Sequence, residues 1–354
     1  MPVYSLNQKL NAAEARHGSA APSAAMHRWR RQQRGMEQLD LRRCDCARGG
    51  QITEGMRKRR LTLGRVAEVH RLWPIGSGRL THFGNTAKTE DLARSLLDAY
   101  DRACCIPLPS SAPGGIDTAT AYSVAERLRQ LRLARGERQV GWKIGFTNRG
   151  IWERYGVYEP MWAPVWDSTT ELLDAPSCVL SLRGLSQPRL EPEIVFGLAR
   201  DPRPGMSLEE LRDCIAWAAH GFEVVHTHFE GWRFTAPDTA ADFALHGRLR
   251  VGPRVPVHDW PTLGADLAAL RVELACDGEA KDRGVASIVL DGPLHALKAM
   301  VEAIAKATPF WAIRAGEVVT TGTITDAWPL APGQRWSTTV SEPRLQGLAL
   351  QTTE

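Results

Sequence analysis

Two glutamates separated by one residue are the clearest sign of chemistry in this sequence. Glu191 and Glu193 flank Pro192 in a stretch with strand character. Alternate residues of a strand face the same side, so the two carboxylates would project together and raise each other's pKa by repulsion. A hard divalent cation relieves that repulsion, and Pro192, which donates no ladder hydrogen bond, suits an edge or bulge beside a site. Taken alone, the pair fits two solvated glutamates on an edge strand better than it fits a metal site.

A third carboxylate, Glu223, strengthens the case for a metal site. It lies between Phe222 and Val224 in an apolar run, where burying a glutamate is costly unless a cation or hydrogen-bond donors accompany it. Three carboxylates with room for water form the octahedral oxygen site that Mg²⁺ or Mn²⁺ prefers. His226 and His228 are nearby candidates for zinc ligands. Strand alternation turns them away from Glu223, so we interpret them as core or supporting histidines.

Two further ionisable side chains have apolar neighbours. Lys143 lies between Trp142 and Ile144. Desolvation there would lower the pKa of the lysine and suit it to proton transfer, although a lysine that extends along an amphipathic strand to reach water is the alternative. Asp167 follows Trp166 and is a second candidate for proton transfer, although in isolation it has the character of a turn or cap aspartate.

Several common motifs are absent from the sequence. There is no G-x-S-x-G nucleophile elbow, no Walker phosphate loop and no G-x-G-x-x-G after a strand. Nucleoside triphosphates and dinucleotides are therefore not expected as cofactors.

The elements that must position these residues change in character along the chain. Apolar periodicity, a capping box at Ser207 and Glu210, and a proline at the first helical position predict helices. The expected helices cover residues 89–104, 117–135, 148–155, 207–220 and 293–307. The expected strands cover residues 139–146, 193–199, 222–227, 246–251, 271–276, 318–324 and 335–340. The dipeptide Asp277-Gly278 indicates a hairpin. Helices followed by a mostly β body predict an α+β fold.

Composition divides the chain into a basic leader and an acidic body. Residues 1–86 carry 16 lysines and arginines against 6 acidic residues, and the remainder carries 28 against 34. We interpret 1–86 as a disordered extension or as upstream sequence outside the mature protein, with an arm that binds nucleic acid or a membrane surface as the alternative.

The remaining compositional features predict a cytoplasmic protein. No apolar run approaches the roughly 18–20 residues needed to cross a bilayer, and the N-terminus has no apolar stretch of the secretory type. The 7 cysteines are scattered and favour reduced thiols over a disulfide framework. We expect no membrane partner.

Seven segments, each of moderate specificity, follow one another in an order that chance does not readily produce. They are GWKIGFTN (141–148), YGVYEPMWAPVWD (155–167), LEPEIVFGLARD (190–201), HGFEVVHTHFEGW (220–232), DTAADFALHG (238–247), DGPLHAL (291–297) and TTGTITDAWPLAPGQ (320–334). Over roughly residues 89–345 the chain thereby resembles the 2-oxopent-4-enoate (2-keto-4-pentenoate) hydratase and 4-oxalocrotonate decarboxylase family. That family is part of the fumarylacetoacetate hydrolase-like superfamily.

The resemblance implies roles and a fold. Position by position, it assigns the metal carboxylates to Glu191, Glu193 and Glu223, a strand lysine to Lys143, an acidic residue to Asp167 and a turn against the substrate carboxylate to Gly322 and Thr323. It implies a twisted, barrel-like mixed β core with packed helices, in a homo-oligomer. Residues 87–190 would form its N-terminal helical and strand segment, and residues 191–350 its β-rich core.

The chain departs from the family pattern at three positions. Family members usually read A-D-N-x-S where this chain has Phe243 and Leu245 in place of the two polar residues, and Ala286 replaces a frequent glycine. These differences affect the expected substrate and leave the metal ligands unchanged.

The resemblance implies a hydratase that adds water to a short unsaturated 2-oxo acid during the degradation of aromatic compounds. A 2-oxo acid chelates Mg²⁺ or Mn²⁺ through its carboxylate and keto oxygens, and the cation stabilises the enolate. Lys143 and Asp167 would relay protons. A decarboxylase acting on 4-oxalocrotonate, or a hydrolase that cleaves a C–C bond of an acylpyruvate, shares this half of the mechanism. A non-catalytic protein that binds nucleic acid through the basic leader is the alternative from another class.

Overall fold

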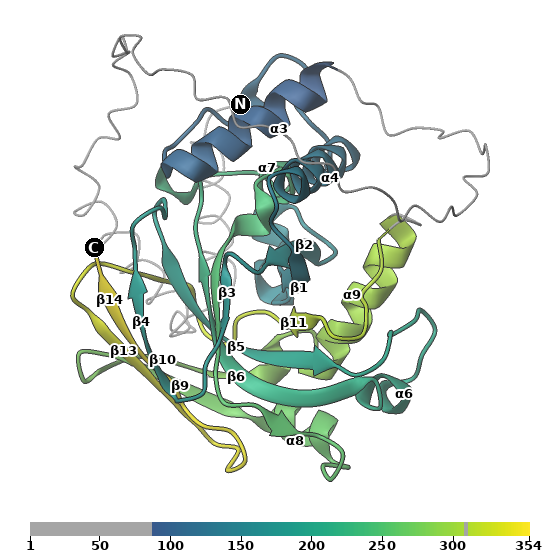
Figure 1. The fold of residues 1–354 in the computed structure, drawn as a ribbon, viewed down its shortest axis with the longest axis vertical. Helices are drawn as coiled ribbons and strands as arrows, with labels where there is room; N and C mark the ends of the chain where they lie inside the picture. The colour runs from purple at the N-terminus through teal and green to yellow at the C-terminus, as the bar shows by residue number, and fades with distance from the viewer. Residues whose placement is uncertain (1–86, 308–310) are drawn as a thin grey trace, which may run out of the picture. The chain divides into compact units, whose positions relative to one another are not determined.

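Two β-sheets form the framework of the described chain. The computed structural model describes residues 87–307 and 311–354, so the predictions for the leader at 1–86 lie outside the described residues. The larger sheet has nine strands, in the order β2-β1-β11-β5-β6-β7-β3, with β12 paired to β5 and β8 paired to β6. The smaller sheet has five strands, in the order β10-β9-β13-β14-β4. Figure 1 shows the two sheets side by side.

The strands of the larger sheet come from almost the whole described chain. They are β1 (Gln139–Gly145), β2 (Met161–Trp166), β3 (Thr170–Leu172), β5 (Arg189–Leu198), β6 (Ile215–Val225), β7 (His246–Val251), β8 (Val255–Pro256), β11 (Val318–Thr320) and β12 (Trp328–Pro329). The smaller sheet consists of β4 (Ser177–Ser181), β9 (Arg271–Cys276), β10 (Glu279–Val285), β13 (Arg335–Val340) and β14 (Ala349–Thr353). The sequence led us to expect two successive segments, residues 87–190 and 191–350. Strand β5 crosses the boundary between them, so both segments contribute strands to the larger sheet.

The helices lie in two groups. Helices α3 (Ala87–Arg102), α4 (Thr118–Ala134) and α7 (Ala236–Ala241) lie together above β1 and β2 (Figure 1). The second group consists of α6 (Leu208–Arg212), α8 (Leu263–Ala269) and α9 (Pro293–Ala307). These helices pack against one another and share a core with Ile194 and Phe196 of β5. Short helical turns complete the set: α5 (Trp152–Tyr155), η1 (Pro109–Ser111), η2 (Arg149–Ile151), η3 (Glu230–Trp232), η4 (Phe243–Leu245) and η5 (Ala286–Ile288). No helix in the described part combines the length and the apolarity that a membrane crossing requires.

Most of the predicted elements are confirmed. The helices expected at 89–104, 117–135 and 293–307 correspond to α3, α4 and α9, and the strands expected at 246–251, 271–276 and 335–340 match β7, β9 and β13. The hairpin at Asp277-Gly278 joins β9 to β10, and both turn residues have positive φ, as a tight hairpin turn requires. Strands β2, β3, β4 and β14 were not expected.

The helix expected at 207–220 is wrong beyond its first turns. The capping box of Ser207 and Glu210 is present, but α6 ends at Arg212, and the chain from Ile215 to Val225 is β6. This strand is buried on both faces, so its sequence shows a continuous apolar run and not the alternation that marks a half-exposed strand. Such a run cannot be distinguished from a buried helix by periodicity.

The curvature of the larger sheet separates its two faces. Even-numbered residues of β5, such as Leu190, Ile194 and Phe196, pack outward against the smaller sheet or α8 and α9. Odd-numbered residues face inward, where Val195 packs with Val165, Val318 and other small apolar side chains. A side chain on this inner face is therefore surrounded by strands, and this environment is where β5 presents its glutamates.

Candidate metal centre and active site

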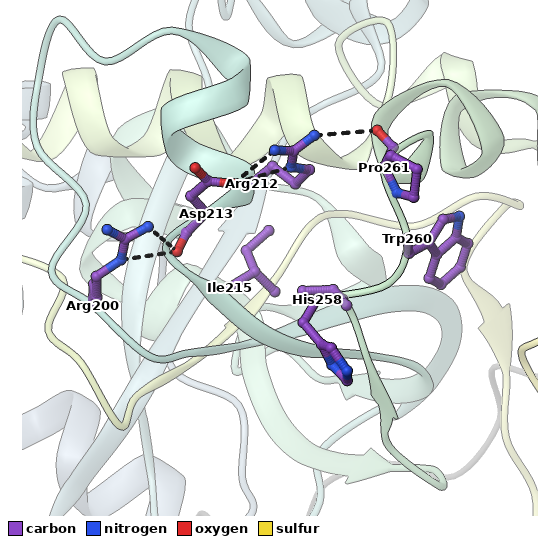
Figure 2. Close-up of a pocket in the computed structure, with 8 residues that line it drawn as sticks. Arg200, Arg212, Asp213, Ile215, His258, Trp260 and Pro261 are labelled. Carbon is purple, nitrogen blue, oxygen red and sulfur yellow. Dashed lines mark hydrogen bonds and ion pairs between the residues drawn. The ribbon is translucent and has the colours of Figure 1, made fainter.

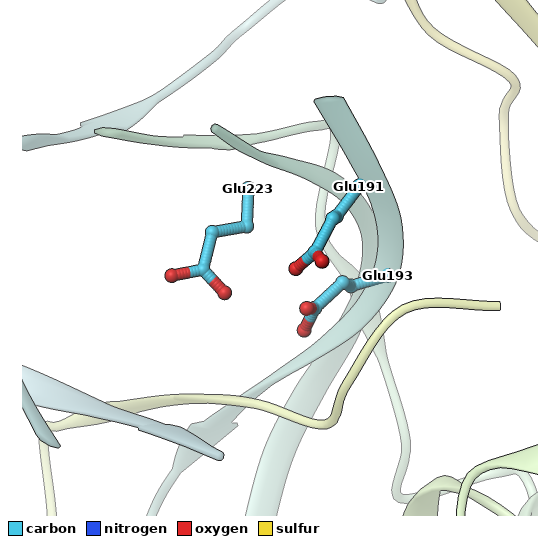
Figure 3. A group of neighbouring side chains, drawn as sticks. All are labelled: Glu191, Glu193 and Glu223. Carbon is cyan, nitrogen blue, oxygen red and sulfur yellow. The ribbon is translucent and has the colours of Figure 1, made fainter. Parts of the chain in front are cut away.

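Three glutamates converge on the inner face of the larger sheet. Glu191 and Glu193 project from β5 and Glu223 from β6, with one carboxylate oxygen of each lying within 4.8 Å of the others (Figure 3). The antiparallel register pairs Glu191 directly with Glu223 and places Glu193 opposite Gly221. Within residues 87–307 and 311–354, this is the only group of three acidic, histidine or cysteine side chains with atoms close enough to share an ion.

Two of these carboxylates have one oxygen engaged and one oxygen left over. Glu193 Oε2 accepts a hydrogen bond from the backbone N–H of Gly322 (2.8 Å), and Glu223 Oε1 accepts one from His246 Nδ1 (2.9 Å). Glu193 Oε1 and Glu223 Oε2 are buried and find no hydrogen bond among the described residues. Because an unsatisfied buried oxygen is costly, the pair of leftover oxygens fits a divalent cation that accepts oxygen ligands.

The electrostatics of the cluster are those of carboxylates confined together. Burial, together with the charge of Glu223, raises the pKa of Glu191 to about 7 against the opposing effect of Lys143. Burial and the charges of Glu223 and Glu191 raise the pKa of Glu193 well above its usual value. Burial also opposes ionisation of Glu223, but Lys143 and His246 outweigh it and lower the pKa of that group. The cluster therefore retains protons that a bound cation would displace.

Lys143 belongs to the same cluster. Its side chain is 3% exposed, its Nζ donates to the carbonyl of Ala244 (2.9 Å), and the same atom lies 3.2 Å from Glu223 Oε2. Burial alone would lower the pKa of the lysine, as the sequence led us to expect, but the charges of Glu223, Glu191 and Glu193 reverse the direction and raise it. The expectation of a lowered pKa is wrong because it considered desolvation without the neighbouring carboxylates.

The structure does not bring Asp167 to the cluster. Both of its carboxylate oxygens accept hydrogen bonds from Arg138, one from the backbone N–H (3.0 Å) and one from the guanidinium (2.9 Å). Arg138 directly precedes β1, whereas Lys143 is five residues further along, a separation of roughly 15 Å in a strand. The hydrogen bonds from Arg138 also lower the pKa of Asp167, which makes its carboxyl group a poor proton donor.

Gly322 and Thr323 have distinct contacts. Gly322 has a φ of +97°, and a Cβ added there would lie 2.0 Å from Thr147 Oγ1, so only glycine fits. Its N–H is directed at Glu193, which makes it a support for a candidate ligand. The hydroxyl of Thr323 donates to the carbonyl of Thr325 (2.9 Å).

Two of the three departures from the family pattern, Phe243 and Leu245, lie in a left-handed turn, and the third, Ala286, begins η5. Phe243, Ala244 and Leu245 have φ values of +55°, +45° and +66°, which cost about 1 kcal/mol each for residues with a Cβ. The turn presents the Ala244 carbonyl to Lys143. The ring of Phe243 lies 4.9 Å from that of Tyr100, in the core beneath the helices, so this apolar replacement packs with α3.

His226 and His228 are core residues. His228 Nδ1 lies 2.6 Å from Asp242 Oδ1, and His226 Nδ1 accepts a hydrogen bond from the N–H of Ser186 (3.3 Å). Both rings are buried beside Tyr100. This agrees with the interpretation of the two histidines as core residues, but the reason given for it does not apply, because β6 ends at Val225 and neither histidine is part of a strand.

Sequence reasoning missed His246 and Thr169. His246 bonds to Glu223 through one ring nitrogen and lies 2.8 Å from Thr169 Oγ1 through the other. The position of His246 at the start of a predicted strand gave no indication of its partner, because Thr169 precedes an unpredicted strand.

A pocket of about 340 Å³ lies near the end of β5 and the beginning of β6 (Figure 2). Its lining residues are Arg200, Arg212, Asp213, Ile215, Val257, His258, Trp260 and Pro261. Glu191 and Glu223 are at the opposite ends of these strands, so the three glutamates do not line this pocket.

Comparisons with known proteins relate the chain to one family. The family model described as "Fumarylacetoacetate (FAA) hydrolase C-terminal" matches residues 165–348, just over half of the chain. A protein of Comamonas testosteroni named 2-hydroxyhexa-2,4-dienoate hydratase is 33% identical over 218 residues, which cover 61% of this chain and 80% of the relative. A 4-oxalocrotonate decarboxylase of Pseudomonas sp is 29% identical over 222 residues, covering 62% and 82%.

A solved structure shares the fold. The 4-oxalocrotonate decarboxylase of Pseudomonas putida G7, complexed with magnesium and adipate, superposes with a TM-score of 0.68 at 24% identity. The match covers 75% of this chain and 97% of that one. The α+β fold expected from the sequence, with a mixed β core and packed helices, is thereby confirmed.

Proposed function

Because this chain belongs to the fumarylacetoacetate hydrolase C-terminal family, we propose that it is a divalent-metal-dependent hydratase acting on a short unsaturated 2-oxo acid. The substrate would be of the 2-hydroxypenta-2,4-dienoate (2-oxopent-4-enoate) type, which arises in the degradation of aromatic compounds. One observation carries the proposal: three carboxylates converge, the buried Glu193 Oε1 has no hydrogen bond, and the buried Glu223 Oε2 has only the ion pair with Lys143. The relative named a hydratase, at 33% identity, supports the choice of reaction.

Glu191, Glu193 and Glu223 would hold the cation, which we propose to be Mg²⁺ or Mn²⁺. The donor set consists of carboxylate oxygens only, as these ions prefer, and the partly exposed Glu191 leaves one side of the cluster less enclosed. A divalent cation bound there supplies Lewis acidity toward the carboxylate and keto oxygens of a 2-oxo acid.

Lys143 would move the proton that the reaction requires. Hydration of a conjugated 2-oxo acid needs a proton delivered to carbon, and the buried Nζ of Lys143 is protonated and lies beside a candidate ligand oxygen. We do not assign a proton relay to Asp167, because both of its oxygens are bound to Arg138. In our proposal Gly322 supports Glu193, and Thr323 lies against the substrate carboxylate.

We further propose that the enzyme works in the cytoplasm as a homo-oligomer and acts on a small molecule without nucleic acid. The relatives named 2-hydroxyhexa-2,4-dienoate hydratase and 4-oxalocrotonate decarboxylase support the small-molecule substrate.

A decarboxylase is the second candidate. The relative named 4-oxalocrotonate decarboxylase is nearly as similar as the hydratase, at 29% identity. Loss of CO₂ from a substrate with a distal carboxylate uses the same electron sink as hydration. The residues around the glutamates therefore support either reaction.

A substrate panel separates the candidates. With Mg²⁺, the purified full chain should remove the ultraviolet absorbance of 2-hydroxypenta-2,4-dienoate, and EDTA should abolish the loss. Release of CO₂ from 4-oxalocrotonate without hydration of the dienol would favour the decarboxylase. Absence of turnover of any 2-oxo acid, together with nucleic-acid binding that disappears on deletion of residues 1–86, would contradict both.

A further inference from the structure

The two oxygens of Glu223 have different environments. Oε1 accepts a hydrogen bond from His246 Nδ1 (2.9 Å), while Oε2 lies 3.2 Å from Lys143 Nζ and is one of the two oxygens left over in the cluster. A glutamate side chain has three rotatable bonds, so a carboxylate held at only one oxygen by a flexible lysine would sample several orientations. The hydrogen bond from His246 removes that freedom by fixing which oxygen faces the other glutamates.

The orientation of His246 is itself fixed. The residue is the first of β7 and directly follows the left-handed turn of Phe243–Leu245, and its ring is 1% exposed. Its Nε2 lies 2.8 Å from the hydroxyl oxygen of Thr169, on the opposite side of the ring from Glu223. The imidazole is thus held at both nitrogens between a threonine and a carboxylate.

The chemistry of the partners constrains the direction of each hydrogen bond. A carboxylate that binds a cation has no proton to donate, so Nδ1 of His246 must carry one when Glu223 is a ligand. In the neutral imidazole Nε2 is then an acceptor. The Thr169 hydroxyl has two acceptors within reach, Nε2 of His246 at 2.8 Å and the carbonyl oxygen of Trp166 at 3.1 Å, and its oxygen accepts from the backbone N–H of Trp166 (3.3 Å). Donation over the shorter contact orients the imidazole, and Trp166, Thr169, His246 and Glu223 are all buried.

We propose that His246, oriented by Thr169, is a positioning residue that holds Glu223 so that Oε2 faces the metal position formed with Glu191 and Glu193. The proposal rests on the metal site of the proposed function. It does not depend on which 2-oxo acid is the substrate. Partners of metal ligands typically contribute 10- to 100-fold to metal affinity, which sets the expected scale of the effect.

Two substitutions at the same position test the direction of the hydrogen bond. In His246→Asn the side-chain amide N–H takes the place of Nδ1 and still reaches Glu223. In His246→Gln the amide takes the place of Nε2 and reaches Thr169 instead. We expect the affinity of the metal-free full-length protein for Mn²⁺, titrated without substrate by electron paramagnetic resonance, to fall about 10- to 100-fold in His246→Gln. In His246→Asn it should stay within about threefold of the wild type.

A second pair keeps the test decisive if the His246 variants do not fold. Thr169→Val removes the hydroxyl that orients the imidazole, and Thr169→Ser retains it. We expect Mn²⁺ affinity to fall about 3- to 10-fold in Thr169→Val and to remain unchanged in Thr169→Ser, at the low end of the range for supporting residues. Equal affinities within each pair that folds would overturn the proposal, because His246 would then only fill space.

The same titration distinguishes the proposal from the function on which it rests. Wild-type protein that binds Mn²⁺ and shows the predicted order of variants, yet does not hydrate the dienol, supports the positioning role and contradicts the hydratase. Wild-type protein that binds no Mn²⁺ overturns the positioning role and the metal-dependent function together.

Discussion

The two ends of the β5–β6 pair carry charged residues in opposite states. Near Leu198 and Ile215, the arginines of the pocket in Figure 2 are satisfied by the protein: Arg200 donates to the carbonyl of Asp213 (2.9 Å), and Arg212 pairs with the Asp213 carboxylate (2.8 Å). At the other end, the fully buried Glu193 and Glu223 each retain an oxygen without a hydrogen bond.

This difference shows what marks a site in this molecule. The arginine end has a pocket, but its charges are partly exposed and already paired, so a ligand would gain little there. At the glutamate end three carboxylates converge beside one lysine, and the buried Glu193 Oε1 has no hydrogen bond. A bound cation would offset the cost of this arrangement, so unmet coordination, and not the presence of a pocket, indicates chemistry in this molecule.

Replacing Glu193 should produce the largest contrast between the two ends. Glu193→Gln keeps the shape and the acceptor for Gly322 but removes one ligand charge. We expect metal-dependent turnover to fall at least about 1,000-fold, since several kcal/mol of transition-state stabilisation depend on the cation. The melting temperature of the metal-free protein should not fall, because the raised pKa already favours the neutral form of Glu193 and the amide has the same shape. Arg212→Ala at the other end should leave turnover within about twofold, as is usual for a paired surface residue.

Turnover of Glu193→Gln close to that of the wild type would remove Glu193 from the ligand set. A comparable loss in Arg212→Ala would instead show that the two ends of the strands are coupled. Steady-state kinetics at saturating Mg²⁺ and thermal unfolding with EDTA measure both quantities.

Replacing Lys143 should separate chemistry from metal binding. Lys143→Met retains the buried stem and removes the donor, so we expect kcat to fall about 100-fold, the scale of a lost proton-transfer group. Affinity for Mn²⁺ should stay the same or increase, because a positive charge 3.2 Å from Glu223 Oε2 is removed. Lys306→Met, at an exposed position of α9, controls for the loss of a lysine. A loss of Mn²⁺ binding with normal kcat at saturation would contradict the assigned role.

Replacing Gly322 should impair the support of a ligand without touching the ligand itself. Gly322→Ala places a Cβ 2.0 Å from Thr147 Oγ1 and displaces the N–H that holds Glu193, so we expect Mn²⁺ affinity to fall about 10- to 100-fold. Gly333→Ala is the matched control, since Gly333 has a similar φ of +84° with nothing within 4 Å of the new Cβ. It should cost about 1 kcal/mol of stability and leave Mn²⁺ affinity unchanged. Equal Mn²⁺ affinity in the two variants would show that the contact with Glu193 is dispensable.

The sequence predicted the glutamate end well because its signals are local. Glu191 and Glu193 sit two residues apart on one strand, and Glu223 lies in an apolar run that makes any solvated role costly. The convergence of all three depends on the β5–β6 register, which the family resemblance implied and a single strand pattern does not contain. The helix predicted over 207–220 was wrong from Ile215 onward. The sequence of β6 lacks the alternation of apolar and polar residues that marks a half-exposed strand.

Long-range contacts account for what the sequence did not reveal. His246 and Thr169 are separated by 77 residues, and their hydrogen bond depends on the pairing of β3 with β7. The pKa of Lys143 was expected to be lowered, because its apolar neighbours in sequence are visible and the glutamates that surround it in space are not. Asp167 looked similar to Lys143 in its local sequence, yet its partner Arg138 lies 29 residues earlier in the chain.

Lowering the pH should weaken the binding of Mn²⁺ by the three glutamates, and this is the smallest effect that we predict. It should leave the arginine end unaffected. Glu191, whose pKa is raised to about 7, holds a proton below that pH, and the cation must displace it. Displacement of this proton alone should make Mn²⁺ affinity rise about tenfold between pH 6 and pH 8, with about one proton released per ion bound at the lower pH. The pKa of Glu193 is also raised well above its usual value, so its proton adds to the rise. Calorimetric titrations in buffers of different ionisation enthalpy count the protons released.

Two variants serve as controls for this pH dependence. Glu191→Gln should flatten the slope of Mn²⁺ affinity against pH while weakening binding, and Arg212→Ala should leave that slope unchanged. Affinity that does not vary between pH 6 and pH 8 would mean that the carboxylates are already ionised, and that the contrast in buried charge between the two ends is smaller than the contacts indicate.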